Sequence, residues 1–448
     1  MPRRPFRTLL VAAGLALTPA GARAADLTVW WAKGYYPAQD EGVRRVVEDF
    51  RKDTGTSVEL TFHPESDLPV KLRAALEAGQ PPDVSNATSE FSPSYRRWAY
   101  EGRFVDLGDI VEPIAKSIDP VLLEAGRLPN GRTGERAYYS VPLEAASIHI
   151  HVWRSLLEQA GLDPERIPRE WTAFWAFFCD TAQPAVRKAT GKRNIYGVGL
   201  PSSTVADDTA HSFMEFQLAH DAWFVDADGR LLFGRPGMRQ HLIEALEDFT
   251  RPSRRGCNPP GAVSWGDPDN NANFLNQTVV MTPNPTLSVP GSQRTSSPEN
   301  YYKNVATIPW PNALDGKPLP LLILRWGAEV YAAGRNPEGG KAFLRYLIRP
   351  ERLGPLVEAA QGRYYPALRE LADGPFWTDT ADPHRVVLRR QMTDNPRLRP
   401  WERLSLGLEQ VYAERVWSKA IDRIILEGWT AERAADEAIA RTKQIVGG

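Results

Sequence analysis

Aromatic and planar polar side chains recur where short apolar strands are expected to end. An aromatic ring can stack on a flat C–H face, and carboxylate, amide and amine groups satisfy hydroxyls. A site of this kind rejects ligands that lack the matching hydroxyls, because each unpaired buried polar group costs about 1–3 kcal/mol. We therefore expect a binding site for a small hydroxyl-rich molecule. The candidate residues are Trp31, Lys33, Tyr35, Asp67, Asn86, Glu144, Trp265, Asp267, Asn284, Trp326 and Arg363.

No catalytic motif accompanies these residues. The sequence has no Gly-x-Ser-x-Gly elbow, no His-Glu-x-x-His, no phosphate-binding Gly-x-x-x-x-Gly-Lys and no Gly-x-Gly-x-x-Gly. Carboxylates are plentiful, but glycoside hydrolysis requires a defined separation between two of them, which a sequence does not give. We predict a binding protein and not an enzyme, with an exported glycan-active enzyme as the alternative from another class.

Three basic residues suggest an alternative kind of ligand for the same binding role. Lys33, Arg325 and Arg363 could receive a carboxylate, phosphate or sulfonate group. The ligand would then be an anionic sugar or another small anionic solute instead of a neutral one.

Histidine and cysteine residues give little support for a metal site. His149 and His151 share one face of an expected strand, but no third ligand is evident nearby, so we expect them to line a cleft wall. Cys179 and Cys257 are the two cysteines of the chain, and no Cys-x-x-Cys pair is present. A disulfide and two buried thiols both remain open. We predict no metal and no cofactor.

The N-terminus has the features of an export signal. Arg3, Arg4 and Arg7 precede the short apolar run 9–17, and Ala22-Arg23-Ala24 is a small-x-small cleavage site. We expect residues 1–24 to be removed near Ala24/Ala25 and the mature protein to reach the periplasm. A general secretory signal is favoured over a twin-arginine signal, since paired arginines are common in such regions.

The charge balance excludes two classes of partner. The formal net charge of −1 becomes −5 without residues 1–24, because four arginines and no acidic residue are lost. Such a chain has no electrostatic footprint for nucleic acid or for an anionic membrane. The remaining length accommodates two domain-sized units.

The expected elements place the candidate residues at one edge of a sheet. Residues 27–31 and 58–62 have strand patterns, and Val43, Val46, Val47 and Phe50 between them share one helix face. This order predicts a βαβ unit with parallel strands. In open α/β sheets, ligands bind outside the carboxyl ends of the strands. A second α/β unit is expected from residue 148 onward, followed by a mostly helical region after Pro337.

Five segments of the sequence carry a resemblance to a known family. They are Leu-Thr-Val-Trp-Trp (27–31), Val-Lys-Leu-Arg-Ala-Ala-Leu-Glu-Ala-Gly-Gln-Pro-Pro-Asp-Val (70–84), Phe-Leu-Asn-Gln-Thr-Val-Val-Met-Thr-Pro-Asn-Pro (274–285), Arg-Asn-Pro-Glu-Gly-Gly-Lys-Ala-Phe-Leu (335–344) and Glu-Gly-Trp-Thr-Ala-Glu-Arg-Ala-Ala-Asp-Glu-Ala (427–438). In these segments the sequence resembles the extracellular solute-binding proteins of ABC importers, in the sugar-binding family that includes maltose-binding protein. The resemblance covers nearly the whole mature chain, and the segments occur in the family's order.

The resemblance implies a fold and a role. The fold is a two-lobed α/β periplasmic-binding-protein fold with three interlobe crossovers and a helical C-terminal region. The role is capture of a sugar, polyol or glycoside by hinge closure, with delivery to an inner-membrane ABC permease by a monomer. We place the crossovers near Val141–Glu144, Met281–Asn284 and Trp326–Val330. The N-terminal lobe would be 25–143 with 284–327, and the C-terminal lobe 144–283 with 328–448.

Overall fold

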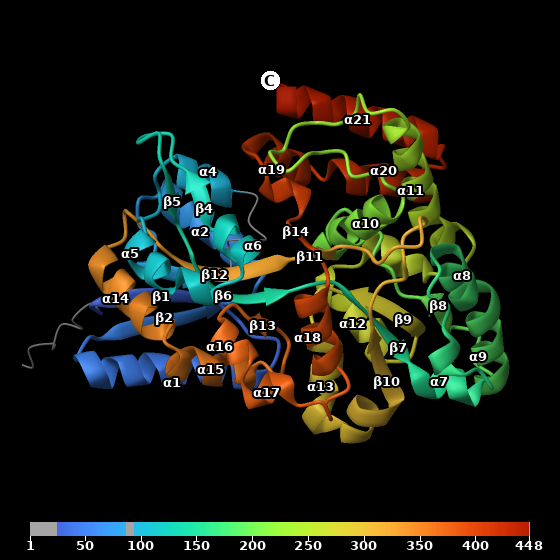
Figure 1. Cartoon of the computed structure of the whole chain (residues 1–448), viewed down its shortest axis with the longest axis horizontal. Helices are drawn as coiled ribbons and strands as arrows, with labels where there is room; N and C mark the ends of the chain where they lie inside the picture. Colours follow the sequence, from blue (N-terminus) through green and yellow to red (C-terminus); the bar gives the residue numbers. More distant parts are fainter. Residues whose placement is uncertain (1–24, 87–93, 448) are drawn as a thin grey trace, which may run out of the picture.

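The protein forms two α/β lobes, seen in a computed structural model that describes residues 25–86 and 94–447 (Figure 1). The expected export signal, residues 1–24, lies outside the described residues. A six-stranded sheet is at the centre of the first lobe and a four-stranded sheet is at the centre of the second. No helix in the described ranges is long and apolar enough to cross a lipid bilayer.

The sheet of the first lobe has the order β13-β6-β12-β3-β1-β2. β1 pairs in parallel with both β2 and β3, and β12 runs antiparallel to β3 and to β6. The expected βαβ unit is therefore present. The strands are β1 (Leu27–Ala32), β2 (Val58–His63), β3 (Val84–Asn86), β6 (Val141–Ala146), β12 (Leu324–Val330) and β13 (Tyr365–Pro366).

Helices cover both faces of this sheet. Successive side chains of β1 point to opposite faces and are alternately buried and half-buried, so both faces carry side chains that pack against helices. Val29 and Trp31 pack into a core with Val43 and Phe50 of α1. Leu72 of α2 belongs to the core on the other face. The helices of this lobe are α1 (Pro37–Thr54), α2 (Leu68–Glu77), α4 (Tyr95–Tyr100), α5 (Gly108–Val111), α6 (Pro120–Ala125), α14 (Pro337–Leu347), α15 (Pro350–Ala359), α16 (Arg369–Ala372), α17 (Pro375–Thr378) and α18 (Arg385–Asp394), with the short strands β4 (Arg127–Pro129) and β5 (Arg136–Tyr138).

The second lobe has the strand order β10-β7-β9-β8 and an aromatic core. The ring of Trp153 stacks on that of Phe274 with centroids 5.2 Å apart, and Trp171 stacks on Trp310 at 6.1 Å. The strands are β7 (His149–Trp153), β8 (Tyr196–Val198), β9 (Val279–Asn284) and β10 (Val305–Ile308). The helices are α7 (Arg154–Gln159), α8 (Trp171–Ala176), α9 (Gln183–Thr190), α10 (Asp207–Ala219), α11 (Met238–Arg254), α12 (Asp267–Leu275), α13 (Ser288–Ser296), α19 (Leu406–Ala413), α20 (Val416–Leu426) and α21 (Ala431–Gly447).

The chain passes between the sheets in three places. It crosses after β6, again between β10 and the short strand β11 (Leu321–Leu322), and finally after β14 (Arg397–Leu398), which pairs with β11. The first crossing follows directly on the predicted Val141–Glu144. The other two differ from the prediction, since Met281–Asn284 lies within β9 and Trp326–Val330 lies within β12.

Strand pairing also divides the chain differently from the predicted lobe ranges, 25–143 with 284–327 and 144–283 with 328–448. β10 belongs to the sheet of the second lobe, whereas α14, α15 and β13 pack in the first lobe. The sequence shows apolar strand patterns, but it does not show the partner of each strand. A strand that pairs within a sheet and a strand that crosses between the lobes have the same apolar pattern.

Cys179 and Cys257 form a disulfide in the second lobe. Cys179 lies in the π-helical turn Phe177–Ala182 between α8 and α9, and Cys257 lies just beyond α11. The bridge therefore ties two helical layers of one lobe and does not cross the cleft.

Loss of this bridge should lower the free energy of unfolding by about 2–5 kcal/mol, because it closes a long loop in the unfolded chain. The bridged residues are 78 positions apart. Urea unfolding of the wild type, with and without dithiothreitol, and of the Cys179→Ala/Cys257→Ala variant measures the effect. The double variant is expected to be insensitive to dithiothreitol. Equal stability of the oxidised wild type and the double variant would contradict this expectation.

Candidate functional site

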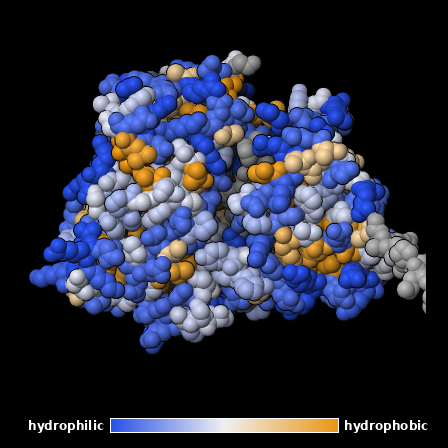
Figure 2. All heavy atoms as spheres, turned by 180° about the vertical axis from the view of Figure 1, so that it is seen from behind, coloured by the Kyte–Doolittle hydropathy of each residue, from blue (hydrophilic) through white to orange (hydrophobic). Residues whose placement is uncertain are grey.

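A pocket lies at one edge of the first sheet and is lined by residues of the first lobe. Figure 2 shows the molecule hollowed between its two halves. The ends of β1 and β3 meet at the pocket with parts of β6 and β12. The volume of the pocket is about 40 Å³. The predicted residues that line it are Trp31, Lys33, Asn86, Glu144, Trp326 and Arg363.

A strand irregularity places Trp326 in this pocket. The register between β12 and β6 shifts between Trp326 and Gly327. Such bulges re-aim a side chain and are frequent next to functional sites. A Cβ atom on Gly327 would lie 2.2 Å from Ser140 Oγ, so this position accepts only glycine without rearrangement. Trp326 packs against Tyr364, with ring centroids 4.6 Å apart.

Arg363 is the buried cation of the pocket. Its guanidinium lies 4.6 Å from the ring centroid of Tyr364 and 5.5 Å from that of Tyr35. Its Nη2 donates a hydrogen bond to Glu65 Oε2 at 3.3 Å. Tyr35 thus supports Arg363 without lining the pocket itself. Arg363 Nε is buried and has no hydrogen-bond partner among the described residues, so one donor of the guanidinium is left for a ligand.

Three carboxyl side chains, those of Glu144, Glu65 and Asp40, line the pocket. Burial raises the pKa of Glu144 to about 7, and the charge of Glu65 adds to this effect while Arg363 opposes it. The sequence prediction missed Glu65 and Tyr364. The position of Glu65, two residues after the end of β2, could have identified it, since β2 is parallel to β1 and ends at the same edge.

The second lobe presents carboxylates towards the same cleft. Asp267, at the start of α12, accepts a hydrogen bond from the main-chain N of Asp208 at 3.0 Å. Asp267 keeps exposed surface but is enclosed by protein on its other sides. This enclosure and the charge of Asp207 raise its pKa to about 7, and Glu65 of the first lobe acts in the same direction. Burial raises the pKa of Asp208, and the charges of Asp267, Asp207 and Glu65 add to this effect, so carboxyl groups of the two lobes face each other across the cleft.

Several predicted residues lie outside the pocket. Asp67 is exposed at the start of α2. Trp265 is 8% exposed in the core of the second lobe. Asn284 Nδ2 donates to Thr286 O at 2.8 Å and shapes its own turn. The main-chain N of Ala32 donates to Asn86 Oδ1 at 2.7 Å, so this pocket residue also fixes the end of β1.

The two histidines of β7 are engaged in internal hydrogen bonds. His149 Nδ1 lies 2.7 Å from Gln391 Oε1, and His151 Nδ1 lies 3.0 Å from Thr307 Oγ1. Both side chains are fully buried, and burial lowers the pKa of His149 to about 4. Within the described ranges, no three His, Cys, Asp or Glu side chains gather as a metal site would require.

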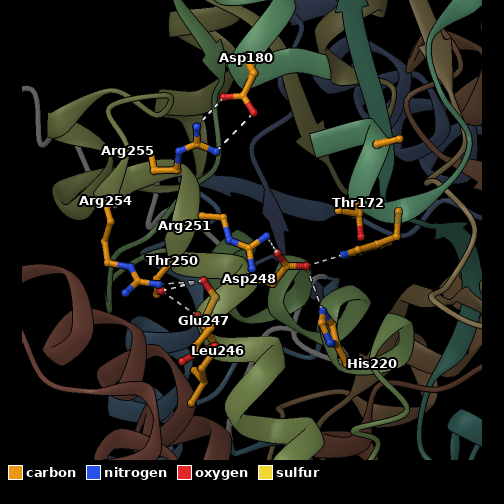
Figure 3. A network of polar contacts seen from close by, with 12 residues as sticks. Thr172, Asp180, His220, Leu246, Glu247, Asp248, Thr250, Arg251, Arg254 and Arg255 are labelled. Carbon is orange, nitrogen blue, oxygen red and sulfur yellow. Dashed lines mark hydrogen bonds and ion pairs between the residues drawn. The ribbon is translucent and has the colours of Figure 1, made fainter. Parts of the chain in front are cut away.

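The buried Asp248–His220 pair of the second lobe is not an acid–base site. Asp248 Oδ2 accepts hydrogen bonds from His220 Nε2 at 3.0 Å and from Trp171 Nε1 at 2.7 Å, and Arg251 pairs with its other oxygen (Figure 3). Burial alone would raise the pKa of Asp248, but these hydrogen bonds and the charge of Arg251 hold it below the usual value. The partners of Asp248 all belong to the second lobe, so the Asp248–His220 pair connects α8, α10 and α11 within that lobe.

Residues 45–385 match the family described as bacterial extracellular solute-binding proteins, which covers most of the chain. The chain belongs to this family. A search of curated proteins finds no match. The resemblance stated from the sequence is thus confirmed for the family. The matched range contains the pocket residues Asn86, Glu144, Trp326 and Arg363, whereas Trp31 and Lys33 precede it.

Solved structures share the fold at low sequence identity. An ABC transporter solute-binding protein of Thermotoga lettingae, bound with α-D-tagatose, is 19% identical with a TM-score of 0.74, covering 94% of this chain and 99% of that one. Maltose-bound MalE3 of T. maritima is 16% identical, with a TM-score of 0.73 and coverages of 93% and 99%. A sugar transporter protein of Arthrobacter chlorophenolicus with laminaribiose is 16% identical, with a TM-score of 0.70 and coverages of 93% and 98%. The predicted two-lobed α/β fold is confirmed.

The raised pKa of Glu144 predicts a pH-dependent stability. Between its unfolded value of 4.5 and its folded value of about 7, the native state binds more protons than the unfolded chain. The contribution of Glu144 therefore lowers the free energy of unfolding as the pH rises through this window. Glu144→Gln should gain roughly 1–3 kcal/mol relative to wild type between pH 5 and pH 7.5.

Urea unfolding at several pH values measures this difference. Glu59→Gln, which changes an exposed glutamate of β2, is the matched control and should follow the wild type at every pH. A constant difference between Glu144→Gln and wild type across the window would contradict the assigned pKa.

Proposed function

We propose that this protein captures a neutral hydroxyl-rich solute, a sugar, polyol or glycoside, in the cleft between its lobes. The observation that carries the proposal is the pocket itself, in which the rings of Trp31, Trp326 and Tyr364 adjoin the charged groups of Glu144 and Arg363. Rings stack on the faces of a sugar, and the charged groups satisfy its hydroxyls. Relatives in fold bound to tagatose, maltose and laminaribiose support the same ligand class.

The capture mechanism is a hinge motion of the two lobes. A pocket of about 40 Å³ holds little more than one water molecule, whereas ligand pockets span about 300–1,000 Å³. The lobes must therefore separate about their three crossings to admit a sugar. A ligand that contacts both lobes then favours the closed arrangement, because it gains contacts there that the open form lacks.

The charge of the cleft favours a neutral ligand over an anionic one. Lys33 and Arg363 are outnumbered by Glu65, Glu144 and Asp267, while the third proposed cation, Arg325, is 1% exposed and donates to Ser140 Oγ at 3.1 Å inside the first lobe. An anionic sugar would meet more carboxylates than cations. The same arrangement supports binding without turnover, since Glu65 already serves as a partner of Arg363 and Asp267 as a partner of a main-chain amide.

In the cell, we propose that the protein works in the periplasm and hands its solute to an ABC permease of the inner membrane. Membership in a family of extracellular binding proteins supports the exported location. The two lobes offer the permease a surface that changes when the cleft closes.

A ligand panel tests the proposal. Tagatose, maltose, laminaribiose and sugar alcohols are compared with glucuronate, amino acids and polyamines in a thermal-shift assay, since a bound ligand raises the melting temperature by mass action. A neutral sugar or polyol should give the largest shift. Shifts confined to amino acids or polyamines would remove the proposed ligand class, and hydrolysis of a chromogenic glycoside would assign the protein to the enzyme class.

Variants on opposite walls locate the site. Lys33→Ala on the first lobe and Asp267→Asn on the second should each weaken binding of the panel sugar with the largest shift by roughly tenfold, since each loses a hydrogen bond to a charged group. Asp67→Asn, at an exposed position outside the pocket, should bind as the wild type does. Calorimetric titration measures all three, and equal affinity of all variants would place the ligand elsewhere.

A further inference from the structure

The lobes also touch away from the pocket, and an arginine of the first lobe makes one of these contacts. Arg96 of α4 is 8% exposed, although its neighbour Arg97 lies on the exposed face of the same helix. Its guanidinium leaves the first lobe, with Nη1 donating to Arg403 O at 2.7 Å and Nη2 to Leu404 O at 3.5 Å. Both acceptors belong to the chain that enters the second lobe after the third crossing. A long charged side chain is thus buried in the opposite lobe.

Glu409 of α19 completes this contact from the second lobe. Its Oε1 accepts a hydrogen bond from the main-chain N of Arg96 at 3.1 Å, and the side chain is 2% exposed. This amide lies in the first turn of α4, where a helix has no acceptor of its own. The Glu409 carboxylate of the second lobe therefore accepts a hydrogen bond from a main-chain N–H group of the first lobe.

The contact buries the charged side chains of Arg96 and Glu409, each of which would cost free energy to bury alone. Burial lowers the pKa of Arg96 to about 10 and raises that of Glu409 to about 7, while each charge partly offsets the penalty on the other. The guanidinium of Arg96 binds main-chain carbonyls and the carboxylate of Glu409 binds a main-chain amide, so each side chain supplies its own bonds between the lobes. When the lobes separate, both groups return to water, so the contact exists only in the arrangement that brings α4 against α19.

The contact lies at one end of the cleft. α4 and α19 are both towards the top of Figure 1, with the crossings between the lobes below them and α13 near the bottom. At the α13 end, Tyr36 Oη of the first lobe donates to Ser288 O of the second at 2.9 Å. The lobes are therefore joined on both sides of the pocket. A displacement of about 1 Å takes a hydrogen bond of 2.7 Å beyond its range, so even a modest opening at the upper end breaks the Arg96 contacts.

We infer that Arg96 and Glu409 form a latch across the cleft, which holds the two halves of the site in register and opposes opening. Its part in capture rests on the proposed function, whereas the latch itself depends only on contacts between the lobes. Arg96 acts as a positioning residue, since it lies outside the pocket and reaches the ligand only through the relative placement of Glu144 and Asp267.

A distance measurement without any sugar tests the latch. Both native cysteines are engaged in the disulfide, so spin labels can be attached through Glu77→Cys on α2 and Lys419→Cys on α20, two exposed positions on different lobes. With the latch intact, the distance distribution should be narrow. Arg96→Ala should add longer distances or replace the narrow distribution with them, whereas Arg97→Ala on the same helix should leave it unchanged.

Two further variants separate a latch from a general effect on folding. Arg96→Lys keeps a charged donor and should retain most of the short distances, and Glu409→Ala should behave as Arg96→Ala does. Circular dichroism and the melting temperature establish that each labelled variant is folded. A folded Arg96→Ala protein with the wild-type distance distribution would overturn the inference. If no sugar of the thermal-shift panel binds, only the proposed function is contradicted, because the distance measurement contains no sugar.

Discussion

Parallel pairing of β1 with both of its neighbours determines where the pocket can form. With Trp30 opposite Thr61 on one side and Ser85 on the other, the three strands run in the same direction and end at the same edge. Lys33, Glu65 and Asn86 therefore emerge together, although helices separate them in the sequence. Antiparallel β12 then adds Trp326 to this edge. The site follows from strand direction, and the helices serve to keep those strands parallel.

This dependence explains how much the sequence could predict. The alternation of Leu27, Val29 and Trp31 and the helical spacing of Val43 and Phe50 are local patterns, and the βαβ unit they predict is present. Because strand ends in such a unit share an edge, the same reasoning grouped Lys33 with Asn86, and both residues line the pocket. Both conclusions needed only short stretches of sequence and one geometric rule.

The remaining features depend on pairing between distant segments. Segments of β9 and β12 were predicted to be crossovers, because their sheet partners, β7 and β6, cannot be read from their own residues. Asn284 looks like a strand-end ligand residue in the sequence, yet its amide closes its own turn. Tyr364 was missed because it precedes a two-residue strand, β13, which is too short to give a pattern. The contact of Arg96 with the second lobe has no local signal either, since an arginine on a surface helix is ordinarily solvated.

The electrostatics of the cleft and the contacts at its ends have opposite effects on closure. Burial is the main cause of the raised pKa values of Asp208 and Asp267 in the second lobe, and the charge of Glu65 of the first lobe adds to it. Ionised carboxylates on the two lobes therefore repel one another when the lobes come together. Bonds made outside the pocket, by Arg96 at one end and Tyr36 at the other, act against this repulsion without occupying the ligand's place. A ligand shifts two states only by its difference in affinity between them, so hydrogen bonds from its hydroxyls to both walls favour the closed arrangement.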